Sequence, residues 1–416
     1  MSSHDGEVLK ISAKGAVTFT DDDMDVASVS PGGFVTIEHS TGRIFTSSER
    51  FEARAVNGGV QRHYYKNGSE IGADEGRAWL RGFLPTLLRD MAVNADQRVA
   101  RALDKGGPTA VLDLVNSTNT AYAKSVYLRE LYKQRRLDGA MLARSLGQAA
   151  RQVTSDYDLA EVLIAAADHQ PIDQAMPDFV AAAGNVKSDY DERRVLSRAL
   201  ANPSLTTSAA SAIFKAATPG MGGTGISSAY DLAELLSAAP PAMISQDASG
   251  WAAAVRTIDS AYDRRRAISA ALTKGAAAST VDAALDATAG LSSAYDLAEL
   301  LIECEHQGLL SDQTAPAYLK ATSAISSHYD RRRTLEAVAR SPIGDRSLAD
   351  AAALAGGIGS DYERAEALIA LGHARGVGPA ARKALQDAAM GIRSDYDRGR
   401  VLSDFAKSGV LVSASR

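Results

Sequence analysis

An internal repeat constrains this sequence more than any other feature. Eight segments share the pattern Ser-x-Tyr-acid, then four residues, then an aliphatic residue. Their tyrosines are Tyr157, Tyr190, Tyr230, Tyr262, Tyr295, Tyr329, Tyr362 and Tyr396. Successive tyrosines are 33, 40, 32, 33, 34, 33 and 34 residues apart, and Tyr122, with Thr120 in the serine position, belongs to a degenerate ninth copy. A period of this length is typical of arrays of stacked units.

Each motif predicts the start of a helix, which we call the motif helix. Ser followed three residues later by Asp or Glu is a capping box. In the copy around Tyr262, the Ser260 hydroxyl can accept from the N–H of Asp263, and the Asp263 carboxylate can reach back to the N–H of Ser260. The aliphatic residues six positions after each tyrosine, together with the residues nine positions after it, mark a buried stripe. The former are Leu163, Leu196, Leu236, Ile268, Leu301, Leu335, Leu368 and Leu402.

A second, Ala-rich helix, the return helix, is expected between each motif helix and the next motif, after Pro or Gly breakers. Two helices in about 33 residues is the size of an α-solenoid unit, and one such unit cannot bury its apolar face alone. We therefore predict a mostly α protein, a right-handed α-solenoid over residues 119–416. The one long spacing contains the Gly-rich segment 218–225. This segment lacks the Lys-Ser/Thr of a phosphate-binding loop, so we interpret it as a loop insertion.

The first 118 residues differ from the repeats in composition and pattern. Residues 1–72 are predicted to form a small antiparallel β domain, because short β-branched runs at 8–11, 17–20, 34–39, 51–55 and 60–65 alternate with Gly- and Asn-rich turns. Residues 73–118 are predicted to be an irregular helical junction that includes Trp79 and Phe83. A solenoid needs a cap at its end, and the β domain could be the N-terminal one.

Charge alternates along the repeat. The residues four positions after each tyrosine are Glu161, Arg194, Glu234, Arg266, Glu299, Arg333, Glu366 and Arg400. Equivalent positions on stacked helices lie about 10 Å apart, within reach of Glu and Arg side chains. We therefore expect a Glu–Arg row that ties one repeat to the next.

The repeated tyrosine has two interpretations. On a helical wheel it lies roughly opposite the buried stripe and close to the Glu–Arg row. It is expected either to pack between repeats with its hydroxyl bonded, or to form, with Arg194, Arg266, Arg333 and Arg400, a binding stripe, because Tyr and Arg are favoured anchors in interfaces. We call the eight tyrosines the tyrosine row.

Composition and motifs exclude several classes of protein. The 416 residues carry 45 basic and 50 acidic side chains, a balance unlike that of a nucleic-acid-binding protein. Cys304 is the only cysteine and falls on the buried stripe, and the seven histidines form no metal-binding pair. The acidic run 21–23 is interpreted as a solvated turn and not as a Ca²⁺ loop. The arginine triplets 264–266 and 331–333 could bind phosphate, but ion pairing with the Glu steps is the favoured explanation. No catalytic, metal or cofactor site is predicted.

The Ser-x-Tyr-Asp repeats after a short β region resemble a bacterial domain of unassigned role found in extracytoplasmic parts of membrane-anchored regulators, including beta-lactam-sensor-type metallopeptidases. The resemblance implies a sensing or scaffolding role and a periplasmic setting. No catalytic motif of those peptidases occurs in the sequence. The polar start and the lack of a long apolar run predict neither a signal peptide nor a transmembrane segment, so an exported form would need a targeting segment outside this sequence.

These observations favour a non-catalytic scaffold or sensor that binds a protein or peptide. The alternative is a polyanion- or phosphate-binding module that uses the repeated arginines. After the last motif helix only residues 410–416 follow Gly409, too few for a return helix. We expect Val410 and Leu411 to fold back over the open apolar end, and the alternative is a homodimer through that end.

Overall fold

The computed structural model describes residues 2–4, 7–41, 47–202, 205–220 and 225–411. It is mostly helical, with a small N-terminal antiparallel sheet, as predicted. Contacts between residues divide the chain into two compact units, Met1–Arg135 and Arg136–Arg416. Part of the predicted loop insertion, residues 221–224, lies outside the described residues. None of the described helices is both long and apolar enough to cross a lipid bilayer.

The first unit begins with β-strands. In chain order they are β1 (Ser2–His4), β2 (Glu7–Lys14), β3 (Val17–Phe19), β4 (Val26–Val29), β5 (Phe34–Thr41), β6 (Ser47–Val56), β7 (Gly59–Lys66) and β8 (Ser69–Glu70). Six of them form an antiparallel sheet in the order β1-β2-β5-β6-β7-β8, and β3 pairs with β4 in a separate hairpin. The register places Ile37 opposite Phe51 and Phe51 opposite Tyr64, so these three side chains lie on the buried face of the sheet.

Helix α1 (Ala73–Asp90) covers that buried face and contributes Leu80 and Leu84 to the core. Trp79 and Phe83, four residues apart, stack at 5.8 Å between ring centroids and pack against the same core. The helix continues past Pro85.

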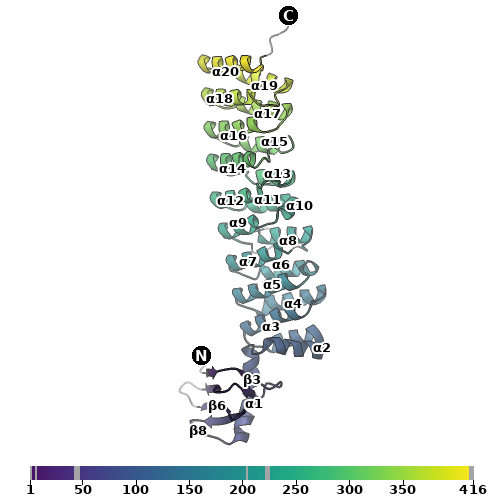
Figure 1. Ribbon diagram of the computed structural model, residues 1–416, viewed down its shortest axis with the longest axis vertical. Helices are drawn as coiled ribbons and strands as arrows, with labels where there is room; N and C mark the ends of the chain where they lie inside the picture. Colours follow the sequence, from purple (N-terminus) through teal and green to yellow (C-terminus); the bar gives the residue numbers. More distant parts are fainter. Residues whose placement is uncertain (1, 5–6, 42–46, 203–204, 221–224, 412–416) are drawn as a thin grey trace. The chain divides into compact units, whose positions relative to one another are not determined.

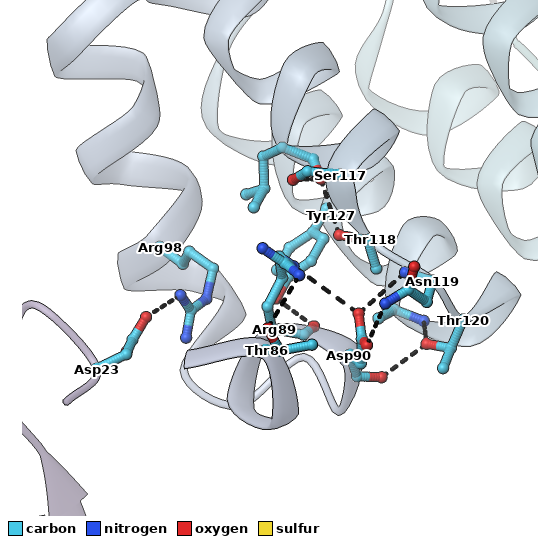
Figure 2. Close-up of polar contacts among 12 residues, drawn as sticks. Asp23, Thr86, Arg89, Asp90, Arg98, Ser117, Thr118, Asn119, Thr120 and Tyr127 are labelled. Atoms are coloured by element: carbon cyan, nitrogen blue, oxygen red, sulfur yellow. Dashed lines mark hydrogen bonds and ion pairs between the residues drawn. The ribbon is translucent and has the colours of Figure 1, made fainter. Parts of the chain in front are cut away.

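Helices α2 (Ala95–Ser117) and α3 (Ala121–Gln134) complete the first unit, and α2 is interrupted by non-helical backbone at Gly106 and Gly107. Figure 2 shows how α3 is anchored to the end of α1. The backbone N–H of Asn119 donates to Asp90 Oδ1 at 2.9 Å, and the Thr120 hydroxyl donates to the Asp90 carbonyl at 2.6 Å. The buried Tyr127 hydroxyl donates to the Arg89 carbonyl at 2.7 Å. Thr120 also caps α3, as the degenerate ninth motif predicted.

The second unit consists of motif helices and return helices. The motif helices are α5 (Asp156–His169), α7 (Asp189–Leu200), α9 (Ala229–Ser237), α12 (Ala261–Ala271), α14 (Ala294–His306), α16 (His328–Arg340), α18 (Asp361–Gly372) and α20 (Asp395–Ser408). The return helices are α4 (Gly139–Gln152), α6 (Met176–Ala183) after the 3-10 turn η1 (Ile172–Ala175), α8 (Thr207–Ala217), α11 (Ala248–Arg256) after the short α10 (Pro241–Gln246), α13 (Ala278–Asp286), α15 (Ala315–Ser323), α17 (Asp345–Gly356) and α19 (Pro379–Met390).

Within this unit each motif helix packs against the next motif helix, and each return helix against the next return helix (Figure 1). The predicted stripe is buried from Leu163 to Leu368, and Leu402 on the last motif helix is partly buried. Cys304 and Phe405, nine residues after their tyrosines, are fully buried.

Every motif serine caps its helix. From Ser155 to Ser394, each hydroxyl accepts from the N–H three residues later, as the capping box predicted. In the described motifs from Tyr190 to Tyr396 the reciprocal bond of the box is not formed. At two steps the preceding motif supplies an acid instead: Asp189 accepts from the N–H of Ser228 at 2.7 Å, and Asp361 accepts from the N–H of Ser394 at 2.8 Å. The serine N–H is thus bonded to an acid one repeat earlier.

The described end of the chain folds back, as one of the two alternatives predicted. Gly409 adopts φ 76°, in the left-handed region. Val410 is 1% exposed, and its carbonyl accepts from Gln386 Nε2 at 2.8 Å. The N–H of Leu411 donates to the Phe405 carbonyl at 3.1 Å. Val410 therefore covers part of the apolar end formed by α18 and α20. The homodimer stays an untested prediction.

The caps generate a stability prediction. Ser293→Ala removes an acceptor that lies 3.1 Å from the N–H of Asp296, and should lower the free energy of unfolding by about 0.5–2 kcal/mol. Adding Ser327→Ala should roughly double this loss, because the two caps do not touch. Thermal melts measure both losses. Ser292→Ala, at the exposed neighbouring position, is the matched control, and capping variants that melt with the parent would contradict the role of the serine.

Candidate functional site

The tyrosine row is exposed in the structure. Each tyrosine is the second residue of its motif helix. The exposed fractions of the eight tyrosines run from 53% at Tyr329 to 76% at Tyr396. Within the described part of the chain, none of the eight hydroxyls makes a hydrogen bond. The expectation that these tyrosines pack between repeats with bonded hydroxyls is therefore wrong. The serine cap and the buried stripe orient the helix so that the ring points to solvent.

Ion pairs join the members of the Glu–Arg row in twos. Arg194 Nη2 lies 2.6 Å from Glu161 Oε1, and Arg333 Nη2 lies 2.7 Å from Glu299 Oε1. Each arginine also pairs with the acid three residues before it, Asp191 in the case of Arg194. The four pairs are Glu161–Arg194, Glu234–Arg266, Glu299–Arg333 and Glu366–Arg400. Glu299 thus pairs with Arg333, and its predicted second neighbour, Arg266, pairs with Glu234.

The three remaining steps carry a different kind of ion pair, which was not predicted from the sequence. The arginine three positions after the tyrosine binds the acid that directly follows the next tyrosine. These pairs are Arg193–Asp231 at 2.9 Å, Arg265–Asp296 at 2.9 Å and Arg332–Glu363 at 2.5 Å. Their signal was present in the sequence, since these arginines occur only in the motifs that also carry the second arginine. The seven contacts between motif helices therefore alternate between two kinds of ion pair.

Paired guanidinium groups lie close to six of the eight tyrosine rings, all except Tyr262 and Tyr295. The Arg194 guanidinium lies 5.8 Å from the centre of the Tyr157 ring and 5.9 Å from that of Tyr190. The same arrangement recurs at Tyr362 and Tyr396, both contacted by Arg400. These distances are within the range of cation–π attraction. The surface is therefore a line of exposed rings separated by arginines, and each of these arginines is held in place by the carboxylates that pair with it.

Another set of arginines, two positions after the tyrosine, donates hydrogen bonds to backbone carbonyls. Arg331 Nε donates to the carbonyl of Ile325 at 3.1 Å, and Arg364 Nε donates to the carbonyl of Ile358 at 2.9 Å. Arg264 is buried and donates to the carbonyls of Ala287 and Ala289. All members of the two arginine triplets thus have partners within the chain. This arrangement weakens the case for a phosphate site.

A buried carboxyl stands at this same position in one motif. Glu192 is 2% exposed, as are Leu159 and Leu232 at the equivalent positions of two other motifs. Burial, with a smaller contribution from the Asp189 carboxylate, raises the pKa of Glu192 to about 7. The carboxyl therefore changes its charge near neutral pH.

Two of the hollows on the described part of the second unit lie beside motif helices. One, of about 480 Å³, lies in the tyrosine row and is lined by Tyr262, Arg266 and Ser237, whose buried hydroxyl has no hydrogen-bond partner. The other, of about 500 Å³, follows the end of α5 and is lined by His169 and Arg136, among others. Neither hollow could be predicted from the sequence, because hollows depend on where helices end.

The other candidate groups have structural roles. Cys304 is fully buried, and burial raises the pKa of its thiol to about 12, so it is not a nucleophile at neutral pH. In the acidic turn, Asp23 pairs with Arg98 (Figure 2), and Asp22 accepts from the Thr20 hydroxyl at 2.6 Å. Among the described residues, no group of three or more His, Cys, Asp or Glu side chains could hold a metal ion.

Comparison with known proteins finds no matching family model, no similar curated protein and no similar solved structure.

The ion pairs generate a second prediction. Glu299 and Arg333 are each about one quarter exposed, so Glu299→Ala should cost under about 1 kcal/mol of unfolding free energy. A double-mutant cycle with Arg333→Ala, measured by urea unfolding, should give a coupling of about 0.5–1 kcal/mol. The control cycle combines Glu299→Ala with Arg266→Ala and should give a coupling free energy near zero. Equal couplings in the two cycles would contradict the pairwise arrangement.

The buried Glu192 carboxyl generates a third prediction, on the pH dependence of stability. Its pKa is raised on folding from the ordinary 4.5 to about 7, so the folded state binds more protons between these values. The free energy of unfolding should therefore fall as pH rises from about 4.5 to about 7, by about 3 kcal/mol in total. Glu192→Gln, which cannot ionise, should remove this part of the pH dependence, and Glu192→Leu should stabilise the protein above pH 7. Urea unfolding at pH 5 and pH 8 measures the difference, and parallel pH profiles for parent and Glu192→Gln would contradict the assignment.

Proposed function

We propose that this chain is a non-catalytic scaffold or sensor that binds a protein or peptide, and that the tyrosine row is its binding surface. The observation that carries the proposal is the exposure of all eight tyrosines together with their unbonded hydroxyls. An exposed line of apolar rings contributes little to folding, whereas Tyr and Arg are the residues that most often dominate binding energy. Arginines already held by ion pairs lose little side-chain entropy on binding.

The proposed architecture suits this role. We propose that the repeats stack into a right-handed α-solenoid. The packing of each motif helix on the next supports it. In such an array, equivalent residues recur at regular intervals along one surface, so a long partner could contact many tyrosines at once.

The alternative, a polyanion-binding module, has less support. Arg194, Arg266, Arg333 and Arg400 are each paired with two carboxylates, and a phosphate would have to compete with both. If a polyanion such as heparin bound, its affinity would fall steeply with salt, because counterions are released.

A selection experiment tests the proposal. A library of random linear peptides displayed on phage is selected on the intact chain, and enriched peptides are measured against the triple variant Tyr262→Ser, Tyr295→Ser and Tyr329→Ser. We expect peptides whose affinity falls at least tenfold in the variant, because three ring contacts are lost. Met390→Ser, at an exposed apolar residue on a return helix, is the matched control. Peptides that bind parent and triple variant equally would place the binding surface elsewhere, and a failure to enrich any peptide would count against peptide binding.

A further inference from the structure

We propose that the tyrosine row docks an extended, cationic, proline-rich segment in the polyproline II conformation. The inference rests on the proposed function and specifies the chemistry of the partner. It depends on three observations: the repeat of one exposed ring per motif helix, the free tyrosine hydroxyls, and the excess of carboxylates along the row.

The spacing of the row selects the conformation of the partner. Consecutive motif helices pack directly, and packed helices lie about 8–10 Å apart, so one ring recurs about every 8–10 Å. A polyproline II helix has three residues per turn and rises about 3.1 Å per residue, so it presents the same face every ~9.3 Å. A β-strand turns opposite faces at residues three apart, although three residues span a similar length. Only the polyproline II chain meets successive rings with every third residue.

The hydroxyls favour the same conformation over an α-helical partner. An α-helix also returns to one face after seven residues, about 10.5 Å, but its carbonyls are engaged in internal hydrogen bonds. Polyproline II has no internal hydrogen bonds, and its carbonyls remain free to accept. A tyrosine hydroxyl is a donor, and the eight hydroxyls of the row have no acceptor in the described chain. The hollow beside Tyr262, with the unpartnered Ser237 hydroxyl, leaves room for a side chain of such a segment.

Charge along the row favours a cationic segment. The residues one, three and four positions after the eight tyrosines include twelve carboxylates and seven guanidiniums, a net charge of −5. All seven guanidiniums have carboxylate partners in the structure. The row therefore attracts Lys and Arg side chains and repels a polyanion.

Three synthetic peptides of 24 residues test the inference against the intact chain by fluorescence anisotropy. The peptide (Pro-Pro-Lys)8 spans about 74 Å as polyproline II, close to the length of eight packed helices. Replacing Lys by Glu gives (Pro-Pro-Glu)8, which reverses the charge, and replacing Pro by Gly gives (Gly-Gly-Lys)8, which keeps the charge without the preformed conformation. We expect (Pro-Pro-Lys)8 to bind at least tenfold more tightly than either control, because conformation and charge both contribute.

Single variants locate the binding on the row. Tyr262→Ala should weaken (Pro-Pro-Lys)8 binding about tenfold, through loss of the ring. Tyr262→Phe keeps the ring and loses the donor, and should weaken it about threefold. Met390→Ala should leave the affinity unchanged. Tyr262 is 70% exposed, so its variants are expected to fold, and thermal melts verify this.

Four results would overturn the inference. They are equal binding of (Pro-Pro-Lys)8 and (Gly-Gly-Lys)8, no binding of (Pro-Pro-Lys)8, binding that Tyr262→Ala does not alter, and preferential binding of heparin or of cello- or chito-oligosaccharides that Tyr262→Ala abolishes. If the phage selection yields row-dependent peptides without a three-residue proline period, this inference fails while the proposed function stands. If the selection yields no row-dependent peptide, the proposed function itself fails.

Discussion

The serine cap sets the rotational phase of every motif helix, and the other features of the repeat depend on that phase. The bond from the third N–H of the helix to the serine hydroxyl fixes where the first turn begins. Counting from it, the residues six and nine positions after the tyrosine face the core, and the tyrosine lies on the opposite side. Arg and Glu four positions after the tyrosine then face the neighbouring motif helices. The cap fixes where each motif helix begins and, together with the buried stripe, determines which residues are buried, which are paired and which are exposed.

Alternating ion pairs give the array a period of two motifs. Glu299 pairs with Arg333 across one contact, and Arg265 pairs with Asp296 across the contact before it. Pairs of this exposure contribute little free energy each, but like charges would meet if a motif of one kind were stacked on another of the same kind. The alternation therefore selects which kind of motif stacks on which, and contributes less to the overall free energy of unfolding. Six of the seven guanidiniums in these pairs, all except that of Arg265, also lie close to a tyrosine ring.

Much of this architecture could be predicted from sequence, because the repeat supplies many copies of the same evidence. The caps, the buried stripe and the N-terminal sheet were predicted, as was the row of alternating charge. The second kind of ion pair was missed because it links different motif positions, as in Arg193 to Asp231, and only the stacked structure aligns them. Strand β4 was missed because Val26–Val29 is short and follows an acidic turn. The hollow at Tyr262 depends on packing that no local pattern encodes.

The tyrosines show most clearly where local rules stop. A helical wheel places the ring beside the Glu–Arg row, but it does not say whether a neighbour covers the ring. At Tyr157 the neighbour is the Arg194 guanidinium, which is already engaged with Glu161, and the ring stays exposed with its hydroxyl unbonded. The cap and the stripe hold the helix, so the exposed ring adds to folding only through its cation–π contacts. An exposed tyrosine in all eight motifs is therefore difficult to explain by stability alone, and this is the physical argument for assigning the row to recognition.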